Sequence, residues 1–111
     1  MIQCITRAMP ALVRDLYWRP DRIEHIARHD ITPEEVEEAV FGDSGGRLLR
    51  VGPAERNPDE TLYRYFGRTG PGRHLLVVLL YLGRGLAMPV TAREMTSQER
   101  RRFDERHPAR R

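Results

Sequence analysis

The sequence contains no lysine, and all 19 of its Lys-or-Arg positions are arginine. Arginine carries a planar, permanently charged guanidinium that can hold a phosphate through two hydrogen bonds, whereas lysine is a more mobile point charge. Genome base composition can also replace lysine by arginine, so this absence alone assigns no function. Base composition does not explain, however, why the arginines are distributed so unevenly along the chain.

Cysteine and long apolar runs are also scarce. Cys4 is the single cysteine, so no disulfide forms within the chain and nothing indicates an oxidising compartment. The longest apolar run, residues 75–82, is far shorter than the roughly 20 residues of a membrane span. Residues 1–11 include Arg7 and Pro10 and lack the apolar stretch of a signal peptide. We therefore expect a cytoplasmic protein with no membrane partner and a flexible extension over residues 1–11.

Charge separates along the sequence. Residues 1–46 carry five arginines against nine acidic residues, and residues 47–111 carry fourteen arginines against seven, which together give the net charge of +3. The second part is thus strongly basic and the first acidic. This separation predicts an anionic partner for the second part, most simply nucleic acid.

A chain of 111 residues fits one domain, which we place at residues 12–107, with a frayed tail over residues 108–111. Residues 13–18 read as a strand, and Pro20 introduces a helix expected over residues 21–29. A second helix begins after Thr32, which forms a capping box with Glu35, and it ends in the glycine-rich segment 42–46.

After this segment the pattern changes to that of strands, expected over residues 47–51, 61–68, 74–82 and 86–91. In the second of these, Arg64 and Arg68 alternate onto one face and Tyr63 onto the other. The strand 74–82 is apolar enough to be central and covered on both faces. Pro89 requires an edge position or a bulge, because proline lacks an N–H group. A second capping box, Thr96 with Glu99, opens a charged helix that extends to about His107.

This order predicts an α+β fold in which an N-terminal strand and a helical hairpin pack on a curved, mainly antiparallel sheet of about four strands, followed by a short C-terminal helix.

Several segments occur in the order and spacing of one known family. The sequence resembles the BrnT-type toxins over about residues 16 to 105, in Trp18, Pro20 and Asp21, in residues 23–29 and 32–36, in Gly67 and Arg68, in residues 75–80, in Arg84, in residues 91–93, and in Thr96 with residues 99–103. Asp30 stands where that family usually has glycine. The resemblance implies a RelE-like fold and a toxin of a bacterial toxin–antitoxin pair, which cleaves RNA and is held inactive by a ribbon-helix-helix antitoxin. A homo-oligomer and a toxin–antitoxin heterotetramer both stay open.

Metal-free RNA cleavage needs a base for the 2′-hydroxyl, cations for the charge that develops on phosphorus, and an acid for the leaving oxygen. Arg68, Arg84 and Arg93 lie at or beside predicted strand ends, and we expect them to converge on one concave surface as catalytic cations. Family position makes Arg93 the principal candidate. His29 and Tyr63 are the candidates for the base.

Further arginines are expected to bind RNA, namely Arg64, Arg73 and Arg100. His25 and His29 have a spacing that can chelate a metal, but no third ligand is apparent, so neither a metal nor another cofactor is expected. Because no acid–base pair is evident in the sequence, a second hypothesis stays open. The same surface could serve a non-catalytic module that binds nucleic acid or an antitoxin.

Overall fold

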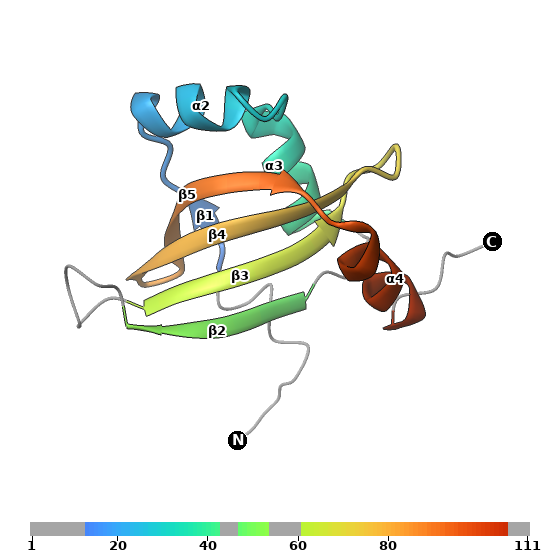
Figure 1. Cartoon of the computed structure of the whole chain (residues 1–111). Helices are drawn as coiled ribbons and strands as arrows, with labels where there is room; N and C mark the ends of the chain where they lie inside the picture. The colour runs from blue at the N-terminus through green and yellow to red at the C-terminus, as the bar shows by residue number, and fades with distance from the viewer. Residues whose placement is uncertain (1–12, 43–46, 54–60, 107–111) are drawn as a thin grey trace, which may run out of the picture.

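The structure, a computed structural model, describes residues 13–42, 47–53 and 61–106, with the backbone alone over residues 47–53. Figure 1 shows the order of the elements, which is β1 (Asp15–Leu16), α2 (Pro20–Ala27), α3 (Pro33–Phe41), β2 (Arg47–Pro53), β3 (Thr61–Arg68), β4 (His74–Gly83), β5 (Leu86–Glu94) and α4 (Ser97–Arg106). The predicted α+β class is confirmed. The extension expected over residues 1–11 and the tail expected over residues 108–111 lie outside the described residues.

The strands of the described residues form one sheet in the order β1-β5-β4-β3-β2. The four strands β2 to β5 pair antiparallel with their neighbours, and β1 alone runs parallel, against Leu86 and Ala87 of β5. The sheet is therefore mainly antiparallel, as predicted. The N-terminal strand is shorter than expected, because the chain leaves the sheet to begin α2 at Pro20.

The hydrophobic core lies between the sheet and the helical hairpin. Buried residues of this core come from both layers and include Ile26, Ile31, Val36, Ala39, Val40, Tyr65, Leu75, Val77, Leu79, Ala87 and Ala92. Gly67 lets β3 approach α3 closely, because a Cβ atom at this position would lie 2.6 Å from the carbonyl oxygen of Ala39. Beside it, the hydroxyl of Tyr65 donates a hydrogen bond to the carbonyl oxygen of Val40 at 3.2 Å.

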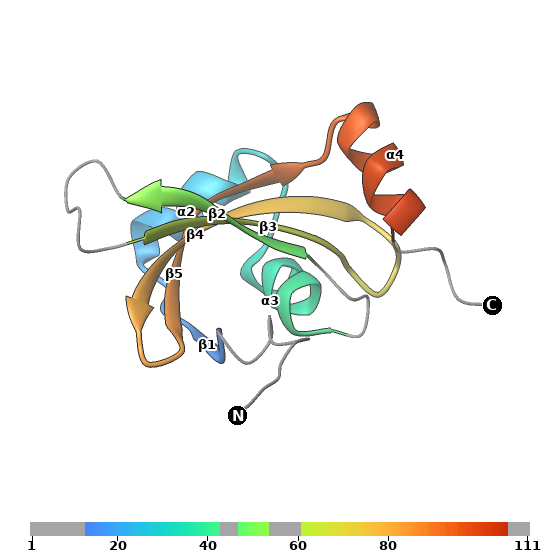
Figure 2. The same cartoon turned by 90° about the horizontal axis from the view of Figure 1, so that it is seen from below.

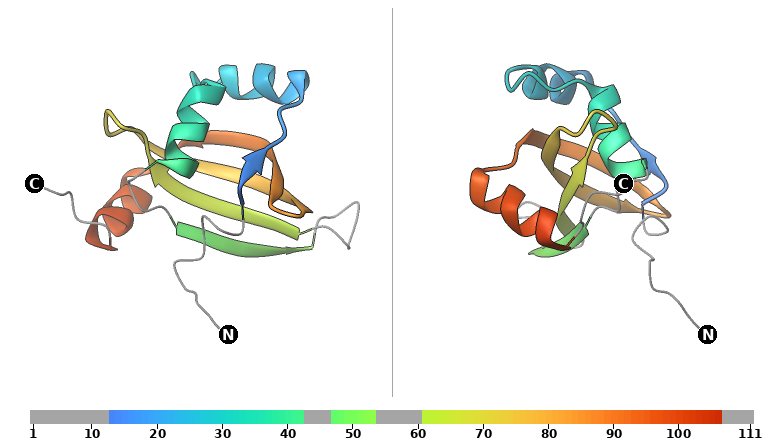
Figure 3. Two further views of the ribbon diagram at one scale, coloured as in Figure 1. Left: turned by 180° about the vertical axis from the view of Figure 1, so that it is seen from behind. Right: turned by 90° about the vertical axis from the view of Figure 1, so that its right-hand side faces the viewer.

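The other face of β3, β4 and β5, which we call the open face, points away from α3. Figures 2 and 3 show that α3 and α4 lie on opposite sides of the sheet. The helix α4 covers only one end of the open face, where Leu76 and Phe103 are each 4% exposed. At the other end Leu82 is 38% exposed, so the expectation that residues 74–82 are covered on both faces is wrong there.

The first helix ends two residues earlier than predicted, at Ala27. The amide of Ile31 donates to Ile26 and that of Asp30 donates to Ala27, which is the hydrogen-bond pattern of a Schellman motif. Asp30 occupies the left-handed position of this motif, with φ of 62°. Glycine is favoured at such a position, because it has no Cβ atom to clash. The next helix begins as predicted, with both hydrogen bonds of the Thr32 and Glu35 capping box present.

Pro89 lies at a bulge, as predicted. The pairing shifts from Val78 with Thr91 to Leu79 with Pro89, which leaves Val90 without a partner residue on β4. Arg22 of α2 supplies a hydrogen-bond donor to Val90 instead, because its Nη1 atom donates to the carbonyl oxygen of Val90 at 3.0 Å. This stretch of β5 lies beyond the two residues that pair with β1, so the proline is also near an open edge.

Candidate functional site

Three of the predicted arginines share the open face. Residues paired directly across antiparallel strands have side chains on the same face of the sheet. Arg68 pairs with His74, and Arg64 pairs with Val78. Arg93 pairs with Leu76, which in turn pairs with Phe66 on β3. The register therefore brings Arg68 and Arg93 to one end of the open face, and Arg64 lies farther along it.

Arg84 does not join them. It lies in the turn between β4 and β5, whereas Arg68 and Arg93 lie close to the turn between β3 and β4 and to α4. Successive antiparallel strands run in opposite directions. The C-terminal end of β4 therefore lies at one end of the sheet, and the C-terminal ends of β3 and β5 lie at the other. The expectation that all three arginines converge is wrong for Arg84.

Arg93 is held by α4 but stays partly accessible. Its Nη1 and Nη2 atoms donate to the two carboxylate oxygens of Glu99 at 3.0 and 3.1 Å, and Nη1 also donates to the carbonyl oxygen of Glu94 at 2.9 Å. The hydrogen bond to Glu99 raises the pKa of Arg93, against the effect of burial. The N–H of Nε and the second hydrogen of Nη2 have no partner in the described part of the chain. With 42% of the side chain exposed, this edge can donate two hydrogen bonds to one phosphate.

Arg68 is more deeply covered by the same helix. Its guanidinium carbon lies 5.3 Å from the ring centre of Phe103, and Nη1 lies 3.8 Å from a carboxylate oxygen of Asp104. Only 17% of its side chain is exposed. Arg68 thus contributes positive charge beneath α4, while Arg93 presents an accessible edge.

Arg73, which we expected to bind RNA, makes several contacts within the protein. Its Nε atom donates to Glu94 at 2.7 Å, and Nη1 donates to Glu35 at 2.9 Å and to the carbonyl oxygen of Asp30 at 2.7 Å. The hydrogen bond to Glu94 is the main cause that raises the pKa of Arg73. The side chain therefore joins the start of α3 and the end of α2 to the end of β5.

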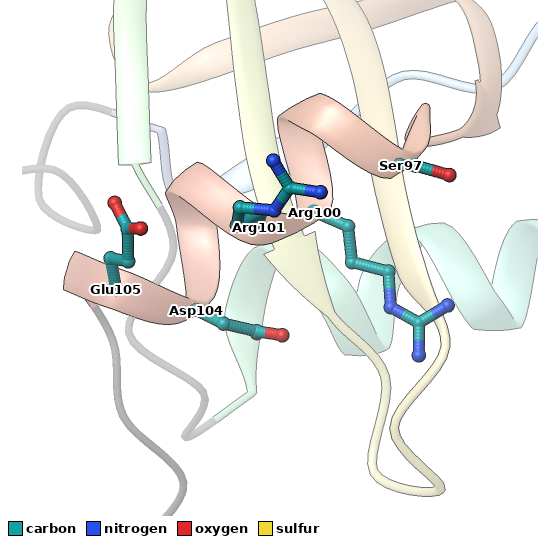
Figure 4. A pocket seen from close by; sticks show the side chains of 5 residues that line it. All are labelled: Ser97, Arg100, Arg101, Asp104 and Glu105. Carbon is teal, nitrogen blue, oxygen red and sulfur yellow. The ribbon is translucent and has the colours of Figure 1, made fainter.

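Arg64 and Arg100, the other two expected RNA-binding residues, are both exposed. The guanidinium carbon of Arg64 lies 5.9 Å from the ring centre of Phe66 on the open face. Arg100 lines an open hollow along α4, together with Ser97, Arg101, Asp104 and Glu105. Figure 4 shows the side chains of Arg100 and Arg101 extending from the helix. Both positions can contact an anion without loss of an ion pair seen among the described residues.

The two expected bases lie on other elements than Arg93, with Tyr63 on β3 and His29 after α2. Tyr63 alternates onto the face that carries α3, where its ring packs edge-on to Tyr81 at 6.3 Å between centres. His29 follows the end of α2, and its ring packs edge-on to that of His25 at 5.7 Å between ring centres. His25 in turn lies 3.0 Å from the hydroxyl of Thr91, measured from Nε2. Within the described residues no hydrogen bond joins Tyr63 or His29 to Arg93.

The structure instead places a different histidine on the open face, one that sequence reasoning missed. His74 lies directly across from Arg68, and its Nε2 atom is 2.7 Å from Oδ1 of Asp104. Asp104 is 30 residues away in sequence, so no local motif connects the pair. The sequence did contain a signal for this position of His74. Side chains alternate between the two faces along β3 and β4, and in the hairpin that these strands form His74 falls on the same face as Arg68.

Among the described residues, no group of three or more His, Cys, Asp or Glu side chains is arranged to hold a metal ion. In the same part of the chain, no helix is long and apolar enough to cross a membrane. The sequence matches no protein-family model and no curated protein.

Proposed function

We propose that this protein is the toxin of a bacterial toxin–antitoxin pair, with a RelE-like fold, and that it cleaves RNA without a metal ion. The resemblance to BrnT-type toxins motivates the proposal. The distribution of arginines on the open face supports it, because Arg64 and Arg93 both reach solvent there and Arg68 adds charge at the same end. Arg100 extends the basic surface onto α4.

The principal supporting observation is the geometry of Arg93. Glu99 occupies one edge of its guanidinium, while the edge formed by Nε and Nη2 has no partner among the described residues. A phosphate bound there would be held by two charge-assisted hydrogen bonds. The same two donors would stabilise the additional negative charge that develops on the phosphoryl oxygens during cleavage.

Two arginine variants test this role. Purified wild-type protein, Arg93→Ala and Arg84→Ala are incubated with RNA in excess EDTA, and folding is verified by circular dichroism. We expect Arg93→Ala to lower the cleavage rate by about 100-fold or more, as loss of an electrostatic donor does elsewhere. Arg84→Ala, at the opposite edge of the sheet, should stay within about twofold of wild type. Equal rates for all three proteins would disprove the role of Arg93.

The toxin assignment needs a separate test in cells. A cytoplasmic ribonuclease toxin should arrest growth when its gene is induced in a bacterial host, and RNA integrity should fall at the same time. A ribbon-helix-helix protein encoded beside it should restore growth. Normal growth at confirmed expression would refute the toxin assignment, whatever the purified protein does to RNA.

A non-catalytic binding module is the second candidate. It is favoured by the contacts that Glu99 and Asp104 make with Arg93 and Arg68, because these carboxylates already satisfy part of the positive charge. Such a module would bind RNA or an antitoxin with an affinity that falls steeply as salt is added, and it would release no cleavage products.

A further inference from the structure

His74 lies near Arg68 and Arg93, and the proposed function assigns it no role. It begins β4 at the arginine end of the open face. Its Nε2 atom lies 2.7 Å from Oδ1 of Asp104 on α4, and its ring packs edge-on to Phe103 at 5.7 Å between centres. Arg68 of β3 reaches the same Asp104 oxygen at 3.8 Å, and the amide of Met95, directly after β5, donates to the carbonyl oxygen of His74.

The contact with Asp104 determines which ring nitrogen can react. An ionised carboxylate only accepts hydrogen bonds, so Nε2 must carry the hydrogen that it donates to Asp104. In the neutral ring, Nδ1 is then the unprotonated nitrogen. Nδ1 has no hydrogen-bond partner among the described residues, and no buried side-chain nitrogen or oxygen there lacks one. Nδ1 therefore reaches solvent, although only 10% of the side chain is exposed.

The position of His74 relative to Arg93 suits a reaction at a phosphodiester. Arg93 pairs with Leu76, two residues along β4 from His74, so the two side chains occupy diagonal positions on one face. Side chains at diagonal positions are about 7 Å apart. One group can thus hold a phosphate while the other reaches the neighbouring 2′-hydroxyl.

We propose that His74, oriented by Asp104, is the general base of the RNA cleavage, an inference that rests on the proposed function. Neutral His74 accepts the proton of the 2′-hydroxyl at Nδ1 while the 2′-oxygen forms a bond to phosphorus. The bond between phosphorus and the 5′-oxygen breaks, and that oxygen takes a proton from water. The products are a 2′,3′-cyclic phosphate and a 5′-hydroxyl, and His74 returns its proton to solvent. Asp104 stabilises the imidazolium formed in between, as an acidic partner of a catalytic histidine does.

His74→Gln is the most informative variant, because the amide of glutamine can still donate a hydrogen bond to Asp104 but cannot accept a proton from the substrate. We expect its kcat to fall by about 100-fold or more, with KM and RNA affinity within about threefold of wild type. His74→Gln should also lose the pH dependence that a proton-accepting base gives to the wild-type rate. Asp104→Asn should also lower kcat by about tenfold or more, because it can favour the wrong ring tautomer.

The control is Glu24→Gln, which places the same new residue at an exposed position of α2 and should cleave at the wild-type rate. Thermal unfolding of each variant shows whether a loss of rate reflects a loss of folding. Wild-type cleavage together with an unchanged rate and pH profile in folded His74→Gln would overturn this inference and leave the proposed function standing. Absence of cleavage by wild-type protein itself would overturn both.

Discussion

Glu99 accepts two hydrogen bonds from the guanidinium of Arg93, and through them it joins α4 to the open face. The same carboxylate accepts a hydrogen bond from the amide of Thr96 at 2.9 Å, while the hydroxyl of Thr96 accepts one from the amide of Glu99 at 3.1 Å. One residue therefore completes the capping box of α4 and occupies one edge of the arginine proposed to hold the phosphate. Any anion that binds Arg93 must lie near this carboxylate.

Neutralising Glu99 should strengthen RNA binding. Glu99→Gln keeps an oxygen that can complete the capping box but removes a negative charge beside the proposed phosphate position. Removal of one like charge at this range is worth about 1 kcal/mol, so we expect the affinity for a short RNA to rise about fivefold at low salt. Fluorescence anisotropy with labelled RNA measures the change.

Glu105→Gln is the control for net charge, because Glu105 lies on the same helix and its carboxylate does not contact Arg93. Its effect on affinity should be clearly smaller. If the two variants bind RNA equally well, the gain comes from total charge and not from the edge of Arg93.

The ion pair between Arg93 and Glu99 should also make the stability of the fold sensitive to acid. The hydrogen bond from Arg93 is the main cause that lowers the pKa of Glu99 below its usual value of 4.5, while burial opposes it and the amide of Thr96 assists it. A carboxyl with a lowered folded-state pKa stabilises the fold fully above its unfolded value, and this stabilisation is lost as pH falls through the folded-state value. Chemical denaturation between pH 6 and pH 3 should show a smaller loss of stability for Glu99→Gln than for wild type. Parallel curves for the two proteins would contradict this assignment.

Arg73 and Arg64 should have opposite effects when each is replaced by alanine. Arg73→Ala leaves Glu35 and Glu94 without their shared cation and should lower the free energy of unfolding by about 1–3 kcal/mol, with RNA affinity within about twofold. Arg64→Ala removes an exposed side chain, so stability should change by less than about 0.5 kcal/mol. Its RNA affinity should fall, and the slope of affinity against salt should decrease by about one. Denaturation and salt titration of both variants check this, and the reverse pattern would reject the two assignments.

Asp30→Gly should stabilise the protein. Asp30 has φ of 62°, a left-handed conformation that costs a residue with a Cβ atom about 1 kcal/mol and costs glycine almost nothing. Its contact with Arg73 uses the backbone carbonyl and survives the change. We expect the free energy of unfolding to rise by about 0.5–1 kcal/mol in urea denaturation. Asp30→Ala, which keeps the strain, should show no such gain, and an equal gain would indicate another cause.

The parts of the fold that the sequence predicted correctly depend on short-range rules. The capping boxes at Thr32 and Thr96 each involve residues three apart, and both are present. The alternation over residues 61–68 put Arg64 and Tyr63 on opposite faces because side-chain direction in a strand has a period of two, and in the structure Tyr63 packs against the core while Arg64 lies on the open face.

The parts that were missed depend on which distant residues meet. Arg73 contacts Glu35 and Glu94, which are 38 and 21 residues away, and no local pattern distinguishes such an arginine from one that binds RNA. The contact between His74 and Asp104 requires both the register of β3 with β4 and the way α4 folds back over the sheet. The separation of Arg84 from Arg68 and Arg93 could have been predicted, however, because successive antiparallel strands end at opposite ends of the sheet.

The sheet topology has a consequence for how the chain folds during synthesis. Strands β2 to β5 pair with their neighbours in sequence, so they can form hairpin by hairpin. The helices α2 and α3 precede these strands in the chain, and Ile26 and Val36 pack against them. As the protein leaves the ribosome, the helical hairpin therefore emerges with its apolar side uncovered until β4 and β5 follow. Pairing of β1 with β5, which joins the two ends of the fold, must be among the last steps.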